Sequence, residues 1–418
     1  MKSVLTSQER LLLWLSVNLG SSSARVRRML EAFDGSVEEV FRAAAKGKLP
    51  KMRFLDDEKL SNIQAHANER YIERIINRLD ELDVKVSTLY SENYPILLKN
   101  IYDPPAVLYY KGMLYPELRL PIAIVGAREP SDYGRRVTRE LAEELASAGA
   151  CIVSGLAYGL DRVAAEGALD AEGNDYPTIA VLGTGPNVVY PSVNRDVYEL
   201  IAERGAVVSE FMPGIGPKPS HFPMRNRIIS GLSKGVVVVE ARTKSGTSIT
   251  VDCALEQGRD VFTLPGNLGN PTCAGNIQLL KQGAILVEEG WDILQEYTYL
   301  YPELPQRQRP AGPMTLTAQE AAGSVVVAET AAAPEKTDTK AVDKQENRAY
   351  IDVQEILPQV SPDEAAVLRL LEDGKQPVDR LIDETQLPAG RILSALTLLE
   401  VKGYVKRLPA RYYELAKK

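Results

Sequence analysis

The apolar positions between Ser7 and Asn77 recur at intervals of three and four residues, as at Val26 and Met29. This spacing places apolar side chains on one face of a helix. The segment therefore predicts a small domain of short amphipathic helices, which we assign to residues 1–85.

Within this segment, the stretch LGSSSARVRRML places a glycine and small polar residues between two expected helices. That layout resembles a helix-hairpin-helix, whose loop amides can bind a phosphate of nucleic acid. A plain helical turn inside a packing domain is the alternative interpretation, and the sequence leaves both open.

From Leu120 to Val287 the pattern changes to short apolar runs that alternate with helical stretches. The runs are IAIVG, CIVSG, TIAVLG, AVVSE, GVVVVE, DVFTLPG and AILVE. Alternation of this kind is typical of a parallel sheet covered by helices on both faces. The prediction is a Rossmann-like, doubly wound α/β domain over residues 86–298.

The remainder of the chain divides into a linker and a second small domain. Residues 299–355 are rich in Pro, Ala, Thr, Gln and charged residues, which predicts a flexible linker. Residues 356–418 predict three helices and a β-hairpin, the outline of a winged helix. Such domains bind DNA or dock proteins, and the pattern does not choose between them.

Composition limits the classes of function. The chain has 418 residues, which suggests several domains, and its 44% hydrophobic and 25% charged residues are those of a soluble protein. A formal charge of −7 argues against a protein that coats nucleic acid, so a nucleic-acid site must be local. Three cysteines without metal-ligand spacing predict free thiols and a reducing cytoplasm. No apolar segment is long enough to predict a membrane span.

Ligands of open α/β sheets collect at the carboxyl ends of the strands, so the residues after each apolar run are the candidates. The first three ends offer glycine turns, amides at helix N-termini and one guanidinium, which suit a phosphate. Ser131 is the expected N-cap of the helix after the first run. The candidate binding residues here are Gly126, Arg128, Ser154, Gly155, Gly183 and Gly185.

The segment HFPMRNRIISG places an aromatic ring beside two arginines. Cations at a helix start oppose the macrodipole, which favours a bound phosphate, and the ring could stack on a base. An aromatic residue packed in the core beside surface arginines is the alternative. The serine and glycine after the GVVVVE run form another anion cradle. The candidates from both segments are Lys218, Phe222, Arg225, Asn226, Arg227, Lys244, Ser245, Gly246 and Thr247.

Groups that could perform catalysis are few. The chain has two histidines, His66 and His221, and its sequence shows no nucleophile–histidine–acid arrangement and no metal-ligand cluster. A structural role is the commoner one for His221, and Glu240 fits a helix cap or a solvated charge. We therefore expect no catalytic residue, no metal and no cofactor.

Between Ser87 and Glu289 the sequence resembles the DprA (Smf) family in the order and spacing of several motifs. They are NYPILLKNIYDPPAVLYYKG, IVGAREPSDYG, SGLAYGLD, VLGTGPNVVYP, HFPMRNRIISGLS and SGTSITVDCALEQGRDVFTLPGN. Arg128 corresponds to the arginine of the family's Gly-Ser-Arg loop, with Ala127 in place of the serine, and Lys218 to a basic residue before the Phe. Tyr158 and Ser192 stand where relatives often carry a basic residue.

The resemblance implies a non-catalytic, cytoplasmic protein that holds single-stranded DNA in the sheet-end pocket and loads RecA during natural transformation. It also implies a homodimer, with single-strand-binding protein as a further candidate partner.

Two alternatives stay open. Related Rossmann-like enzymes cleave the glycosidic bond of nucleoside monophosphates, but SGTSITVDCALE lacks their doubled glycine and correctly spaced glutamate. The winged helix could instead be the main DNA reader, although its expected recognition helix carries only Arg391 near its start.

Overall fold

A computed structural model of the chain describes residues 5–304 apart from 244 and 268, residues 353 and 357, and residues 360–416 apart from 373, 386, 388 and 409–411. The chain forms two compact units, residues 1–307 and 308–418. The predicted linker, 299–355, lies mostly outside the described residues, but Leu304 is buried against the first unit.

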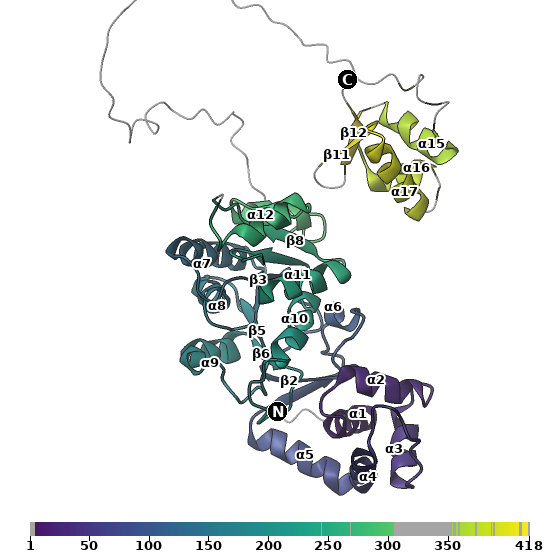
Figure 1. The fold of residues 1–418 in the computed structure, drawn as a ribbon, viewed down its shortest axis with the longest axis vertical. Coiled ribbons are helices and arrows are strands. Elements are labelled where there is room, and N and C mark those ends of the chain that lie inside the picture. The colour runs from purple at the N-terminus through teal and green to yellow at the C-terminus, as the bar shows by residue number, and fades with distance from the viewer. Residues whose placement is uncertain are drawn as a thin grey trace, which may run out of the picture. The chain divides into compact units, whose positions relative to one another are not determined.

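Short amphipathic helices form the N-terminal part, as predicted (Figure 1). They are α1 (Ser7–Asn18), α2 (Ser23–Glu31), α3 (Val37–Ala45), α4 (Asp57–Ala65) and α5 (Glu69–Glu81). Side-chain caps fix several starts: Thr6 caps α1 and Ser36 caps α3 by accepting backbone N–H groups. These helices share one core with the first two strands of the sheet, so the predicted boundary at 85 does not separate two compact units.

The apolar runs predicted as strands all form one nine-stranded sheet in the order β1-β2-β6-β5-β4-β3-β7-β8-β9. The parallel strands are β3 (Pro121–Val125), β4 (Cys151–Ser154), β5 (Thr178–Leu182), β6 (Ala206–Ser209), β7 (Gly235–Val238), β8 (Asp260–Thr263) and β9 (Ile285–Leu286). Two antiparallel strands, β1 (Lys85–Thr88) and β2 (Val107–Gly112), extend one edge and were not predicted.

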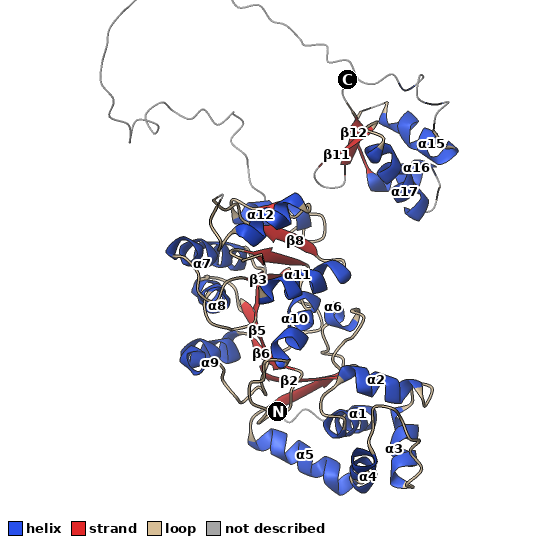
Figure 2. Ribbon diagram, viewed as in Figure 1, coloured by secondary structure: helices blue, strands red, loops and turns tan. Residues whose placement is uncertain are grey.

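Helices cover both faces of this sheet, which confirms the doubly wound α/β class (Figure 2). One face packs against α6 (Ile96–Lys99), α10 (His221–Gly231) and α11 (Gly246–Glu256). The other packs against α7 (Asp132–Ser147), α8 (Leu160–Asp170), α9 (Arg195–Arg204) and α13 (Gly290–Leu294). The first unit also contains α12 (Ala274–Lys281) and two 3-10 helices, η1 (Ser192–Asn194) and η2 (Gln295–Tyr297).

The second unit has the predicted winged-helix elements. They are α15 (Pro362–Leu371), β10 (Gln376–Pro377), α16 (Val378–Thr385), α17 (Ala389–Val401), β11 (Val405–Leu408) and β12 (Tyr412–Leu415). The strands form a small antiparallel sheet in the order β10-β12-β11, and apolar side chains of all three helices close a core. Across the described ranges, no helix is long and apolar enough to cross a membrane.

Candidate nucleic-acid interface

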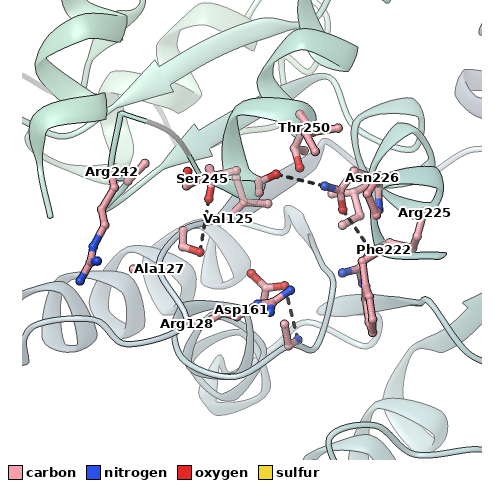
Figure 3. A pocket seen from close by; sticks show the side chains of 18 of the residues that line it. Val125, Ala127, Arg128, Asp161, Phe222, Arg225, Asn226, Arg242, Ser245 and Thr250 are labelled. Carbon is pink, nitrogen blue, oxygen red and sulfur yellow. Dashed lines mark hydrogen bonds between the residues drawn. The ribbon is translucent and has the colours of Figure 1, made fainter. Parts of the chain in front are cut away.

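The candidate site lies at the point where the sheet reverses its order of strands. The chain runs outward from β3 through β4 and β5 to β6, and then returns to β7 on the other side of β3. The loops after β3 and β7 therefore diverge and leave a crevice at the carboxyl ends of these strands. A pocket of about 690 Å³ opens there, lined by both loops and by the first turns of α10 and α11 (Figure 3).

Arg128 and Phe222 line this pocket side by side. Arg128 follows β3 and is exposed, and among the described residues it forms no ion pair or hydrogen bond. Its guanidinium carbon lies 5.9 Å from the centre of the Phe222 ring, and the Tyr190 ring lies 5.7 Å from Phe222. Phe222 is half-buried, so an open aromatic face and an unpaired cation share one wall. This pairing suits a base with its phosphate.

Arg225 forms the floor of the pocket beside Phe222. Its side chain is buried and its Nη1 donates to the carbonyl oxygens of Gly155, at 2.6 Å, and Val181. Burial, opposed by the charge of Asp161 and assisted by that of Arg128, lowers the pKa of Arg225 to about 10. Arg225 is thus a cation held in a fixed position in the lining of the pocket.

Asp161 is a buried carboxyl group that lines the pocket with Arg128 and Arg225. It accepts the amide N–H of Gly155 at 3.1 Å and that of Ala157 at 3.4 Å. Burial raises its pKa, while Arg225, these amides and Arg128 favour its charged form. Two guanidinium groups thus act on one carboxyl group, which leaves an excess positive charge for an anion.

The N-terminus of α11 adds hydrogen-bond donors to the opposite wall. Ser245 precedes the helix, and its buried Oγ has no hydrogen-bond partner among the described residues. Backbone hydrogen bonds within a helix leave its first amides free, and here those of Gly246 and Thr247 have no acceptor in the described part of the chain. Asn226 of α10 fixes this end by donating to the Gly246 carbonyl at 3.2 Å. The arrangement is a cradle for an anion.

Two of the predicted glycines, Gly155 and Gly183, contact side chains that line the pocket but do not line it themselves. A Cβ on Gly155 would lie 2.3 Å from Nη1 of Arg225, and one on Gly183 would lie 2.9 Å from the Phe222 ring. Any larger residue would displace the side chain that it meets. These glycines therefore make room for side chains of the pocket.

The structure brings about half of the predicted binding residues together in the pocket. Those that line it are Gly126, Arg128, Phe222, Arg225, Asn226, Ser245, Gly246 and Thr247. Those that do not are Ser154, Gly155, Gly183, Gly185, Lys218 and Arg227. Lys218 is exposed on the loop before α10, and Gly185 donates its amide to the Ile215 carbonyl. Lys244 lies outside the described residues.

Arg227 requires a correction, because the sequence placed it with Arg225 at a helix start. The helix begins at His221, so both arginines lie in its second turn. Because each residue turns the helix by about 100°, the side chains of Arg225 and Arg227 leave the axis about 200° apart. Arg227 points away from the pocket and pairs with Glu210 at 2.8 Å and Asp103 at 3.4 Å. Pro223 in the first turn was the sequence signal for the earlier start.

Glu210, the partner of Arg227, also contacts the expected helix-hairpin-helix loop. Ser23, the first residue of α2, donates its hydroxyl to Glu210, and the Ser23 side chain is buried. The N-terminus of α2 therefore already faces a carboxylate of this chain. This contact favours the interpretation of the loop as a packing turn.

Several pocket residues were missed by sequence reasoning. They are Glu129, Asp161, Tyr190, Arg242 and Thr250. The position of Asp161, two residues after Gly159 and in the first turn of a helix that follows a strand, was the available signal. Tyr190 gave none, because its ring reaches the pocket through the fold of the loop after β5.

The structure also gives the contacts of Ser131, Glu240 and His221, and the state of the three cysteines. Ser131 caps α7 and in turn donates its amide to Glu240 at 2.9 Å, so Glu240 is a capping residue. His221 bonds the Gly183 carbonyl at 3.1 Å and stacks on Phe211, which fits the predicted structural role. The three cysteines are free. In the described part of the chain, no three His, Cys, Asp or Glu side chains gather as metal ligands.

Comparison with known proteins identifies relatives of both units of the chain. Residues 85–298 match the family DNA recombination-mediator protein A, and residues 354–411 match the DprA winged helix domain. Protein Smf of Escherichia coli is 37% identical over 326 residues, 78% of this chain and 76% of that protein. DNA processing protein DprA of Bacillus subtilis is 42% identical over 224 residues, 53% of this chain and 74% of that protein.

A solved structure shows the same architecture. The X-ray structure of DNA processing protein A from Streptococcus pneumoniae aligns with a TM-score of 0.60 and 31% identity, over 73% of this chain and all of that one. Family, relatives and fold agree over the domain that contains the pocket. The chain belongs to the DNA recombination-mediator protein A (DprA/Smf) family and has a DNA-processing role.

Proposed function

We propose that the pocket between β3 and β7 binds single-stranded DNA and that the protein passes this strand to RecA without catalysing a reaction on it. Arg128 neutralises a phosphate, the amides at the start of α11 bind a second anionic oxygen, and Phe222 stacks on a base. The RecA partner, the homodimer, the contact with single-strand-binding protein and the cytoplasmic location are proposed from the family resemblance.

One observation supports this proposal above the others: the unpaired Arg128 lies 5.9 Å from the half-buried Phe222 ring at the switch point of the sheet. A base can reach such a ring only when it is not paired within a duplex. The arrangement therefore favours a single strand over a double helix.

The competing proposal is a nucleotide-cleaving enzyme. Glu240, the carboxylate after β7, accepts two hydrogen bonds from Ser131 and has 2% of its surface exposed. A buried capping carboxylate is poorly placed to activate water. Release of free base from nucleoside monophosphates by the purified protein would support the enzyme and contradict a purely binding role.

The binding proposal is tested by fluorescence anisotropy of a labelled oligothymidine, as a single strand and annealed to its complement. We expect the protein to prefer the single strand, and Arg128→Ala and Phe222→Ala to weaken that binding. Arg74→Ala is a matched control, because Arg74 is an exposed arginine over the Tyr71 ring on α5, outside the pocket. Equal affinity for both DNA forms, or equal effects of all three substitutions, would overturn the proposal.

A further inference from the structure

Outside the pocket, Tyr102 is the most exposed large apolar or aromatic side chain of the described residues, at 86%. The Arg27 guanidinium carbon lies 4.7 Å from the centre of its ring, and Arg27 Nη1 donates to the Tyr102 carbonyl at 3.2 Å. A cation therefore holds the ring in place while most of the ring stays open to solvent. Core packing does not account for an aromatic ring in this position.

The register of the sheet puts Tyr102 on the same edge as the pocket. β2 runs antiparallel to β6 with Tyr109 opposite Ser209, so the chain before β2 lies beyond the carboxyl end of β6. The pocket lies beyond the carboxyl end of β3. Four strand spacings separate β2 from β3 in the sheet order, which is about 20 Å.

A partly buried ion cluster connects the Tyr102 loop to α10, the helix that carries Phe222. Asp103, next to Tyr102, pairs with Arg227 of α10 at 3.4 Å, and Arg227 also pairs with Glu210, whose side chain is 3% exposed. Ser23 of α2 donates to the same Glu210. The loop, α2 and α10 are thus held as one framework, which fixes the distance between the two aromatic positions.

The surroundings of Tyr102 are basic, although the chain as a whole has a formal charge of −7. α2 carries three arginines and one glutamate, Glu31, whose Oε1 lies 4.0 Å from Nε of Arg27. Arg28, the next residue along α2, is exposed and forms no ion pair among the described residues. Lys99, at the end of α6, is exposed as well. A polyanion would be attracted to this patch.

We propose that Arg27 and Tyr102 form an outer stacking position for the same single strand that enters the pocket. A base stacks on the open face of Tyr102, Arg27 holds the ring from its other side, and Arg28 and Lys99 neutralise the phosphates beside it. This inference rests on the proposed function of the pocket and extends the path of the strand along the carboxyl edge of the sheet.

The test compares a short oligothymidine of about four nucleotides, which fills the pocket alone, with one of about sixteen. In anisotropy titrations with the full chain, Tyr102→Ala should weaken binding of the long strand at least about fivefold and leave the short strand unchanged. Tyr102→Phe keeps the ring and should behave like the unsubstituted protein. Tyr299→Ala removes another exposed tyrosine, at 68%, and is the matched control.

Each outcome separates this inference from the proposed function. If Phe222→Ala weakens both strands and Tyr102→Ala weakens neither, the pocket proposal stands and the outer position is overturned. If Tyr102→Ala weakens both strands equally, Tyr102 acts on the pocket through Asp103, which also overturns it. If Tyr102→Ala abolishes capture of RecA with DNA binding unchanged, the patch around Tyr102 binds protein, and the outer DNA position is overturned. If the unsubstituted protein binds neither strand, the proposed function fails and the outer position fails with it.

Discussion

Arg128 in the pocket and Arg391 in the winged helix are both exposed arginines close to the start of a helix, but their charges are used differently. Arg391 pairs with Asp363 through two hydrogen bonds of 2.6 and 2.8 Å. Arg128 has no such partner among the described residues. The comparison teaches that the number of cations does not locate an anion site, because a paired cation has already lost much of its attraction for phosphate.

The same contrast extends to Lys402 of the winged helix. Lys402 pairs with Glu364 at 2.6 Å, and the buried side of α17 (Ile392, Ala395, Leu396 and Leu399) closes the core of its unit. In the pocket, by contrast, polar and aromatic groups face open space. The contrast holds for Arg391 and Lys402 and not for the whole unit, because three other exposed cations of this unit form no ion pair among its described residues: Arg369, Lys375 and Lys406.

The largest effect that we predict concerns Arg225, the buried cation of the pocket. Arg225→Leu would leave Asp161 and the Gly155 and Val181 carbonyls without their partner, and should lower the free energy of unfolding by about 3–5 kcal/mol. Arg391→Leu, at an exposed pair, should cost at most about 1 kcal/mol. Urea unfolding of both variants measures the difference, and equal losses would contradict the buried role of Arg225.

The second prediction separates the two exposed arginines by their effect on DNA. Arg128→Ala should weaken single-strand binding by about 1–3 kcal/mol, because a charge-assisted contact to phosphate is lost. It should also reduce the slope of log affinity against log salt by about 0.7. Arg391→Ala should change neither quantity. Titrations at several salt concentrations measure both, and an unchanged slope for Arg128→Ala would show that Arg128 touches no phosphate.

The smallest predicted effect is a difference in pH dependence between the two regions. Burial raises the pKa of Asp161, so its contribution to stability is present below the unfolded pKa of an aspartate and is lost as pH rises through the folded value. Burial opposes ionisation of Glu364, but hydrogen bonds from Lys402 and Ser361 outweigh it and lower the Glu364 pKa. The contribution of Glu364 is therefore lost as pH falls.

Unfolding free energies measured across the acid range for Asp161→Asn and Glu364→Gln test these opposite signs. Relative to the unsubstituted protein, each variant should remove one of the two trends. The same sign for both would contradict the assigned environments.

The parallel strands could be predicted from the sequence because buried strands are continuous apolar runs bounded by glycines. The edge strands β1 and β2 were missed for two reasons. KVST has four residues and mixes polar with apolar positions, and VLYYKG lies before the regular alternation of strands and helices that begins at Leu120. The sequence pattern also predicts a boundary at residue 85, which does not divide the first compact unit of the structure. The helices before residue 85 bury their apolar faces against β1 and β2, which a linear pattern does not show.

The site could be predicted in part for a similar reason. Loops after parallel strands meet at one edge, so Arg128, Phe222 and Ser245 were expected to lie together, and they do. Arg225 and Arg227 look alike in the sequence, but their positions on α10 send one into the pocket and the other to Glu210. Only the neighbours of a helix decide which of its sides is functional, and those neighbours are distant in the sequence.

The central claim is that the pocket, and not the winged helix, holds the single strand. Residues 1–307 form a compact unit with its own cores, so they can be produced without the winged helix. The most direct measurement is the affinity of this fragment for a labelled oligothymidine, beside that of the full chain carrying Arg128→Ala. We predict that the fragment keeps the affinity of the full chain and that Arg128→Ala loses most of it. Loss of binding by the fragment, with binding retained by Arg128→Ala, would contradict the claim and move the site to the winged helix.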